Sequence, residues 1–263
     1  MNTHIRSAAS ALGWCLAGML TACSMHMPIP DELASKAEEM PVKRKNSMLT
    51  DRVKWVHFGP YSVEDIHAKG KPTDRSGKFG HSKQASEARY YFSVVSGEKA
   101  PWTCDCRNHA EREDYFPLLG RAREVGYRVT LECSLIPPGG GAPWNMSLVE
   151  EDSSGGNLRG NLSDGERLIE VAGTHEYRGR KAKSLKHTGF QFLDGTGTLG
   201  AVELLGKQKV LIDENIPADV RPILATVSAA LLLYQDLNQR MKEEMQNKSA
   251  YGIEVAAVEQ PRK

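Results

Sequence analysis

The stretch "ILATVSAALLLY" (residues 223–234) decides how the rest of the chain is interpreted. Only Thr226 and Ser228 are polar in it, so a helix formed here would be apolar on every face. A helix of this length spans about 18 Å, whereas the hydrocarbon core of a bilayer is about 30 Å thick. We therefore expect a helix that begins near Pro217 and Asp219 and is buried at the centre of a β structure.

Most of the chain before this helix alternates between apolar and polar residues, which is the pattern of half-buried strands. Turns rich in Gly, Asp and Ser separate the segments, and the clearest alternation is found at residues 127–135. The pattern predicts a mainly β protein, an antiparallel barrel or sandwich that encloses or covers one hydrophobic C-terminal α-helix. The expected strands are residues 53–58, 89–95, 127–135, 144–149, 157–163, 167–172, 189–193, 198–205 and 208–212.

Residues 200–237, "GAVELLGKQKVLIDENIPADVRPILATVSAALLLYQDL", consist of two hairpin strands, a polar turn and the apolar helix. This order resembles the closing segment of the tubby-like superfamily, which includes tubby C-terminal domains, phospholipid scramblases and LURP-one-related proteins. The resemblance implies a closed barrel of twelve strands around one hydrophobic helix. One strand missing from our prediction, or a short helix, could then lie in residues 114–122. No lipid-binding residue of the superfamily has a counterpart that can be aligned.

The first 22 residues have the pattern of a secretory leader, with Arg6 near the start and an apolar run too short to span a bilayer. The leader ends in Leu20-Thr21-Ala22-Cys23, which resembles the lipobox of bacterial lipoproteins. The resemblance implies that Cys23 receives diacylglycerol and that several acyl chains anchor the protein stably. By resemblance to enterobacterial lipoproteins, Ser24 in place of Asp favours the outer membrane of a Gram-negative bacterium, with the protein facing the periplasm.

The domain boundaries follow from this leader. Residues 23–48 contain Pro-rich turns, mixed charge and no sustained apolar period, so we expect a lipid anchor and tether with room for a short helix at 31–39. Residues 49–250 should form a single β-rich domain with the C-terminal helix, followed by a tail at 251–263.

The charge balance argues against nucleic acid as a partner. The chain has 34 Lys and Arg and 33 Asp and Glu, and Arg6 is the only one of these charges before Cys23. Removing the leader therefore leaves no net charge, whereas phosphate binding needs a basic surface. The expected partners are the membrane, through the N-terminal lipid, and an anionic lipid or an envelope protein.

The three cysteines after Cys23 are Cys104, Cys106 and Cys133. The spacing Cys104-x-Cys106-x-x-His109 offers ligands for Zn(II) or Cu(I). Alternatively, one of the first two cysteines pairs with Cys133 in an oxidising periplasm, because these side chains share the inward parity of their strands. Thiol-redox exchange is the third interpretation.

Residues 174–190, "THEYRGRKAKSLKHTGF", concentrate basic side chains between two predicted strands. They form either an electropositive loop that binds lipid phosphates or an acidic partner, or a solvated hairpin tip. His175 and Glu176 do not belong to an H-E-x-x-H zinc motif, because position 179 is Gly. The candidate anion-binding residues are Arg178, Arg180, Lys181, Lys183 and Lys186.

We find no catalytic residues, resident metal or cofactor in a recognisable sequence frame. The sequence therefore fits an outer-membrane lipoprotein that acts as a binding or envelope-maintenance module for lipid or a protein partner. The alternative is a periplasmic thiol-redox or metal-handling factor that uses Cys104 and Cys106.

Overall fold

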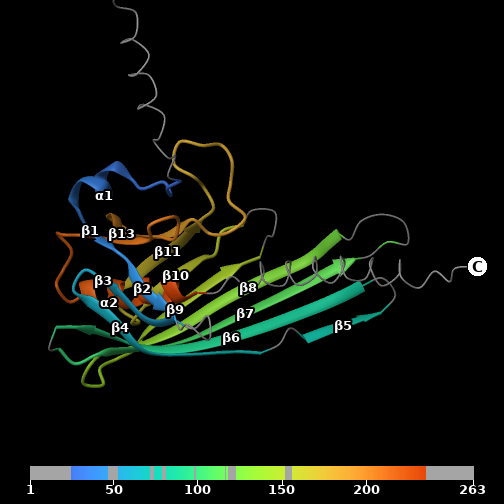
Figure 1. The fold of residues 1–263 in the computed structure, drawn as a ribbon, viewed down its shortest axis with the longest axis horizontal. Coiled ribbons are helices and arrows are strands. Elements are labelled where there is room, and N and C mark those ends of the chain that lie inside the picture. The colour runs from blue at the N-terminus through green and yellow to red at the C-terminus, as the bar shows by residue number, and fades with distance from the viewer. Residues whose placement is uncertain are drawn as a thin grey trace, which may run out of the picture.

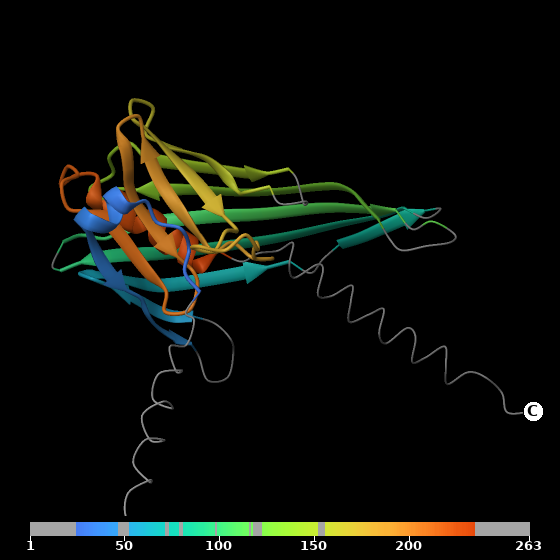
Figure 2. The same cartoon turned by 90° about the horizontal axis from the view of Figure 1, so that it is seen from above.

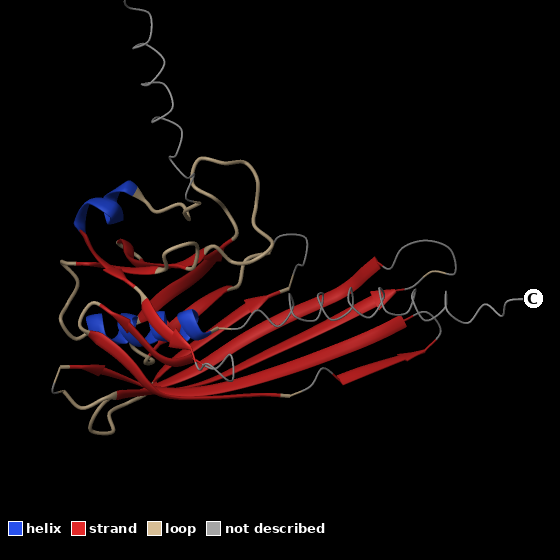
Figure 3. Ribbon diagram, in the orientation of Figure 1, coloured by secondary structure: helices blue, strands red, loops and turns tan. Residues whose placement is uncertain are grey.

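The computed structural model describes residues 25–46, 53–71, 74–78, 81–97, 99–115, 117, 123–151 and 156–234. Within them lie two helices and fourteen strands (Figures 1 and 3). The elements are α1 (Asp31–Lys36), β1 (Ala37–Pro41), β2 (Lys43–Asn46), β3 (Val53–Phe58), β4 (Tyr61–Gly70), β5 (Asp74–Lys78), β6 (His81–Ser96), β7 (Trp102–Tyr115), β8 (Arg123–Ile136), β9 (Trp144–Glu150), β10 (Arg159–Ser163), β11 (Leu168–Thr174), β12 (Gly189–Asp194), β13 (Gly197–Glu203), β14 (Lys209–Asp213) and α2 (Arg221–Leu233).

The described strands form one antiparallel sheet that nearly closes on itself. Their order is β1-β14-β13-β12-β11-β10-β9-β8-β7-β6-β4-β3-β2, with β5 paired to β6 outside this path. The two ends of the order, β1 and β2, are consecutive in the chain and are separated only by Val42. Because β1 pairs with β14 and β2 pairs with β3, one extended segment joins both edges of the sheet.

Helix α2 lies within this sheet and fills its interior (Figures 1 and 2). Every residue of it at positions 223–232 is buried, and it contacts both β13–β14 and β6–β8, which are distant in the strand order. The two polar side chains in its buried stretch are satisfied inside the helix: Thr226 donates a hydrogen bond to the Pro222 carbonyl and Ser228 to the Leu224 carbonyl. The barrel supplies further donors near the C-terminus of α2, where Tyr90 donates to the Ala230 carbonyl.

The predicted fold class is confirmed, since the sheet is antiparallel and barrel-like and the hydrophobic helix is at its centre. The helix begins at Arg221, after a turn that contains Pro217 and Asp219, and the polar residues that follow Tyr234 lie outside the described residues. Within the part of the chain that the structure describes, no helix is both long and apolar enough to cross a membrane.

Residues 31–46, which we assigned to a tether, are part of the domain instead. Leu33 of α1 and Met40 of β1 are fully buried, and β1 supplies the hydrogen-bonding partner that the edge of β14 needs. These strands could not be predicted from the sequence pattern. Strand β2 is exposed along its whole length and β1 buries only one side chain, so neither shows an alternation of apolar and polar residues.

Strands β6 and β8 are longer than the predicted strands 89–95 and 127–135, and β7 was not among the predicted strands. Together they extend beyond the barrel as a twisted ribbon with β5 at its edge (Figures 1 and 2). Polar residues occupy the inward positions of this ribbon, among them Gln84, Asn108 and Asp114. The apolar alternation therefore breaks down along these strands. Residues 114 and 115 complete β7, and most of the remaining segment to 122 lies outside the described residues.

Candidate functional site

The basic loop, residues 175–188, connects β11 to β12 and projects from one end of the barrel, as the gold segment in Figure 1 shows. It contains five basic residues and one acidic residue. Leu185 lies among the basic residues and is 85% exposed. All five predicted anion-binding residues are exposed on this loop: Arg178, Arg180, Lys181, Lys183 and Lys186.

Backbone hydrogen bonds give the loop a defined base. Thr188 donates its backbone N–H to the carbonyl of Thr174, and its hydroxyl lies within hydrogen-bonding distance of the carbonyls of Thr174 and Glu176. Further along, the N–H of Ser184 donates to the carbonyl of His175 at 2.7 Å. The loop therefore begins and ends at fixed positions while its charged side chains reach into solvent.

Two buried histidines occupy this base. The rings of His175 and His187 have centroids 4.2 Å apart, and a carboxylate oxygen of Glu150 lies 3.5 Å from Nε2 of His187. Burial, together with the charge of His175, lowers the pKa of His187 to about 3. The His187 ring is therefore neutral at physiological pH.

Sequence reasoning missed this cluster, because Glu150 and His187 belong to no local motif. They meet His175 only because β9 and β11 end, and β12 begins, at the same end of the sheet. Glu176, the neighbour that suggested a zinc motif, is exposed.

The N-terminal end of the described chain is fixed beside the basic loop. Arg178 donates its backbone N–H to the carbonyl of His26, and the buried carboxylate of Glu203 accepts the N–H of Met27 at 3.0 Å. Nδ1 of His26 lies 2.8 Å from the same carboxylate. Met27 is fully buried over Gly189, where a Cβ atom would collide with its sulfur. Cys23, the predicted site of lipid attachment, lies outside the described residues.

The cysteines meet in the barrel core rather than at the surface. Cys106 and Cys133 face each other on β7 and β8, and their sulfur atoms lie at disulfide distance, 2.04 Å. The expected inter-strand pair thus forms with Cys106. Cys104 is the remaining thiol of the three and is 1% exposed, with its sulfur 3.5 Å from that of Cys106. Burial raises the pKa of the Cys104 thiol far above its usual range.

The structure does not bring His109 to these cysteines. Cys104 and Cys106 share the inward parity of β7, whereas His109 has the opposite parity and pairs with the exposed carboxylate of Glu111 at 3.0 Å. The Cys-x-Cys-x-x-His spacing therefore splits its ligands between the two faces of a strand.

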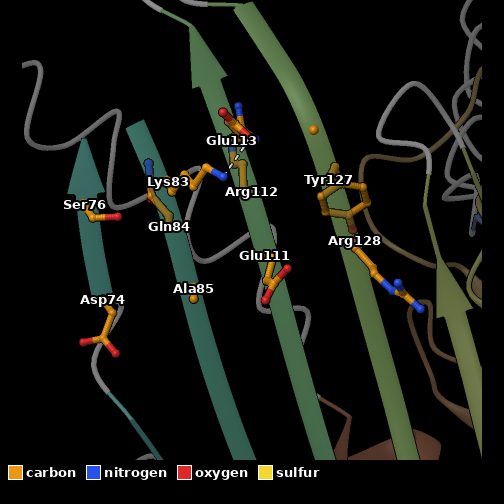
Figure 4. Close-up of a pocket in the computed structure, with 11 residues that line it drawn as sticks. Asp74, Ser76, Lys83, Gln84, Ala85, Glu111, Arg112, Glu113, Tyr127 and Arg128 are labelled. Atoms are coloured by element: carbon orange, nitrogen blue, oxygen red, sulfur yellow. Dashed lines mark ion pairs between the residues drawn. The ribbon is translucent and has the colours of Figure 1, made fainter. Parts of the chain in front are cut away.

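A polar groove of about 460 Å³ lies on the β5–β8 ribbon (Figure 4). At its centre Arg112 forms ion pairs with Asp114 at 2.8 Å and with Glu124 at 2.7 Å, and all three side chains are largely buried. Acidic and basic groups alternate along the groove, among them Lys83 and Glu113. The groove has no excess of either charge that would select one class of ligand.

The chain matches no family model, and comparison with curated proteins and with solved structures found no significant match. The basic loop and the cluster beneath it are therefore interpreted from their own geometry.

Proposed function

We propose that this protein is an outer-membrane lipoprotein, anchored through Cys23 and facing the periplasm, whose barrel domain binds anionic phospholipid headgroups through the basic loop. The main support is a backbone hydrogen bond, in which the N–H of Arg178 in that loop donates to the carbonyl of His26. Cys23 precedes His26 by three residues, which span at most about 10 Å. A lipid on Cys23 would therefore hold the loop at the membrane surface.

The composition of the loop supports this orientation. Its basic side chains would lie at the level of lipid phosphates, where each contributes about 1 kcal/mol of attraction to an anionic surface. Leu185 is exposed among them and would enter the headgroup boundary, where an apolar side chain is stabilised. A protein partner has no comparable support, because an exposed leucine surrounded by cations fits a charged lipid surface better than an acidic protein surface.

The resemblance to the tubby-like superfamily is a further part of the proposal. A helix inside a nearly closed antiparallel sheet agrees with it. The described path has thirteen strands rather than twelve, but β1 and β2 are separated by Val42 alone and together act as one strand.

The thiol-redox alternative has less support. Exchange requires an accessible thiolate, whereas Cys104 is buried and its raised pKa keeps the thiol protonated. A metal-handling role based on Cys104 and Cys106 would need the disulfide of Cys106 to be reduced.

Lipidation is tested by replacing Cys23 with Ala and following incorporation of labelled fatty acid. The variant should incorporate none and should leave the membrane fraction during an alkaline wash. Retention of the variant in the washed membrane would contradict the proposed anchor.

Headgroup binding is tested by co-sedimenting the chain from residue 24 onward, which lacks both the lipid and the apolar leader, with vesicles of phosphatidylglycerol and phosphatidylethanolamine. Combined Arg178→Glu, Arg180→Glu and Lys181→Glu substitutions should weaken binding by more than about 100-fold, because each one removes about 1 kcal/mol of attraction and adds repulsion from the anionic surface. The matched control reverses three exposed lysines on other segments, Lys54, Lys69 and Lys99, and should bind like the parent chain. Equal binding to neutral phosphatidylcholine vesicles, or unchanged binding by the loop variant, would refute headgroup recognition.

A further inference from the structure

The base of the basic loop contains three side chains with the chemistry of a metal centre. One ligand atom from each of Glu150, His175 and His187 lies within 4.8 Å of the other two, and all three residues are buried. We propose that these residues bind a divalent transition-metal ion of the zinc class. The site is independent of headgroup binding and uses none of the exposed cations of the loop.

His175 is oriented as a metal-binding histidine usually is. Its Nδ1 lies 3.1 Å from the carbonyl oxygen of Ser184, which can only accept, so Nδ1 carries the proton and donates. The lone pair is then on Nε2. A backbone carbonyl that fixes the tautomer in this way is the usual outer partner of a histidine ligand.

His187 adds a second imidazole, and its ring is neutral. Its Nε2 accepts a long hydrogen bond of 3.3 Å from the N–H of Leu158, so the lone pair is on Nε2 and Nδ1 carries the proton. A metal ion would take this lone pair in place of the long hydrogen bond. The Phe190 ring stacks on the His187 ring at a centroid distance of 5.3 Å and holds its orientation.

The carboxylate of Glu150 completes the set. Its oxygen lies 3.5 Å from Nε2 of His187, too far for a good hydrogen bond. Two ligands bound to one tetrahedral zinc ion at about 2.0–2.2 Å are about 3.3–3.5 Å apart, so the observed separation suits a shared cation. Two imidazoles and one carboxylate are a donor set that binds Zn(II) and related ions.

A metal ion bound by this cluster would link the basic loop to the barrel. His175 begins the basic loop and His187 is its second-last residue, while Glu150 is the last residue of β9, two strands from β11 in the sheet. One bound ion would therefore fasten both ends of the loop to the barrel. Because the three ligands come together only in the folded chain, the ion binds the folded state preferentially and should also stabilise the domain.

The test uses the full chain, purified in detergent micelles without a polyhistidine tag and stripped of metal with a chelator. Cobalt(II) is titrated first, because its visible absorption reports nitrogen and oxygen coordination, and zinc is then added as a competitor. We expect one equivalent of cobalt to bind, zinc to displace it, and the unfolding temperature to rise with either ion.

Three variants each remove one ligand: Glu150→Gln, His175→Gln and His187→Gln. Each should weaken cobalt binding by more than about 100-fold. Substitutions of residues that only hydrogen-bond a metal ligand typically cost about 10–100-fold in affinity, and these three remove a ligand itself. His109→Gln is the matched control, because it removes an exposed histidine that also pairs with a glutamate, and it should bind like the parent chain. Glu150→Gln preserves the shape of the side chain. If a histidine variant does not fold, cobalt binding by Glu150→Gln alone tests the proposal.

Three results would overturn the proposal. Two are a parent chain that binds no cobalt and a Glu150→Gln variant that binds cobalt as tightly as the parent. The third is loss of binding in Cys104→Ala, which would assign the metal to the cysteine cluster instead.

Discussion

Arg44 on β2 donates a hydrogen bond of 2.8 Å from its guanidinium to the carbonyl oxygen of Leu232, 188 residues further along the chain. The carbonyls of the last turn of a helix have no partner within the helix. Arg44 therefore satisfies one end of the central helix from the segment that closes the barrel. The cationic side chain also lies where the negative end of the helix dipole favours it.

Replacing Arg44 with Ala should destabilise the protein by about 1–3 kcal/mol, the usual contribution of a hydrogen bond to a charged group. Chemical denaturation followed by tryptophan fluorescence measures this change in the free energy of unfolding. Lys45→Ala is the control, since Lys45 is the next residue on β2 and is also exposed. Equal stability of the two variants would show that Arg44 does not support the helix.

The central helix permits a sharper test of the fold. Leu231 and Leu232 are 1% and 5% exposed although they point about 100° apart, whereas Leu233 is only partly buried. Asp at 231 or 232 should therefore prevent folding, because an unpaired buried carboxylate costs enough to cancel much of the 5–15 kcal/mol that stabilises a domain. Leu233→Asp should be milder.

Thermal unfolding monitored by circular dichroism measures these effects. The control is Leu185→Asp, which changes the same residue type at a position that is 85% exposed and should leave the unfolding temperature nearly unchanged. An unchanged unfolding temperature for Leu232→Asp would mean that this face of the helix is exposed to solvent and that the sheet does not enclose the helix.

These residues also show why part of the fold could be predicted from the sequence. Residues 223–234 have no polar face, which already requires an environment that covers every side. Tyr127 to Leu135 alternate because only one face of β8 meets that helix. By contrast, β2 reads Lys43-Arg44-Lys45-Asn46 and is held by backbone pairing and by the helix terminus, which leave no apolar period.

The candidate site was predictable only in part. The basic loop is contiguous in sequence, so its charges and its place between two strands could be anticipated. The cluster of Glu150, His175 and His187 could not, because strand pairing brings together positions up to 37 residues apart. The cysteines are intermediate: inward parity indicated a bridge to Cys133, but the choice of Cys106 required the register of β7 against β8.

The disulfide should contribute measurably to stability. Reducing a bridge between residues separated by 27 positions releases loop entropy worth about 3–4 kcal/mol in the unfolded chain. We therefore expect a reductant to lower the free energy of unfolding by that amount in the parent chain and in Cys104→Ala. Cys106→Ala and Cys133→Ala should be insensitive to the reductant. Peptide mapping that joins Cys104 to Cys106 would refute this pairing.

The buried imidazole of His187 makes stability depend on pH. Its pKa is about 3 in the folded protein and about 6.5 when exposed, so below pH 6.5 the unfolded chain takes up a proton that the folded chain does not. This group therefore leaves the free energy of unfolding undiminished above pH 6.5 and lowers it progressively as the pH falls toward 3. Between pH 6.5 and 5 this single group should remove about 1.5–2 kcal/mol.

The measurement is the free energy of unfolding of the metal-free chain at a series of pH values across this interval. His187→Gln cannot take up the proton, so its stability should fall less steeply by that amount. His109→Gln, which removes an exposed histidine, should keep the slope of the parent chain. Parallel curves for the parent and His187→Gln would mean that His187 titrates normally and that the cluster at the base of the loop is open to water.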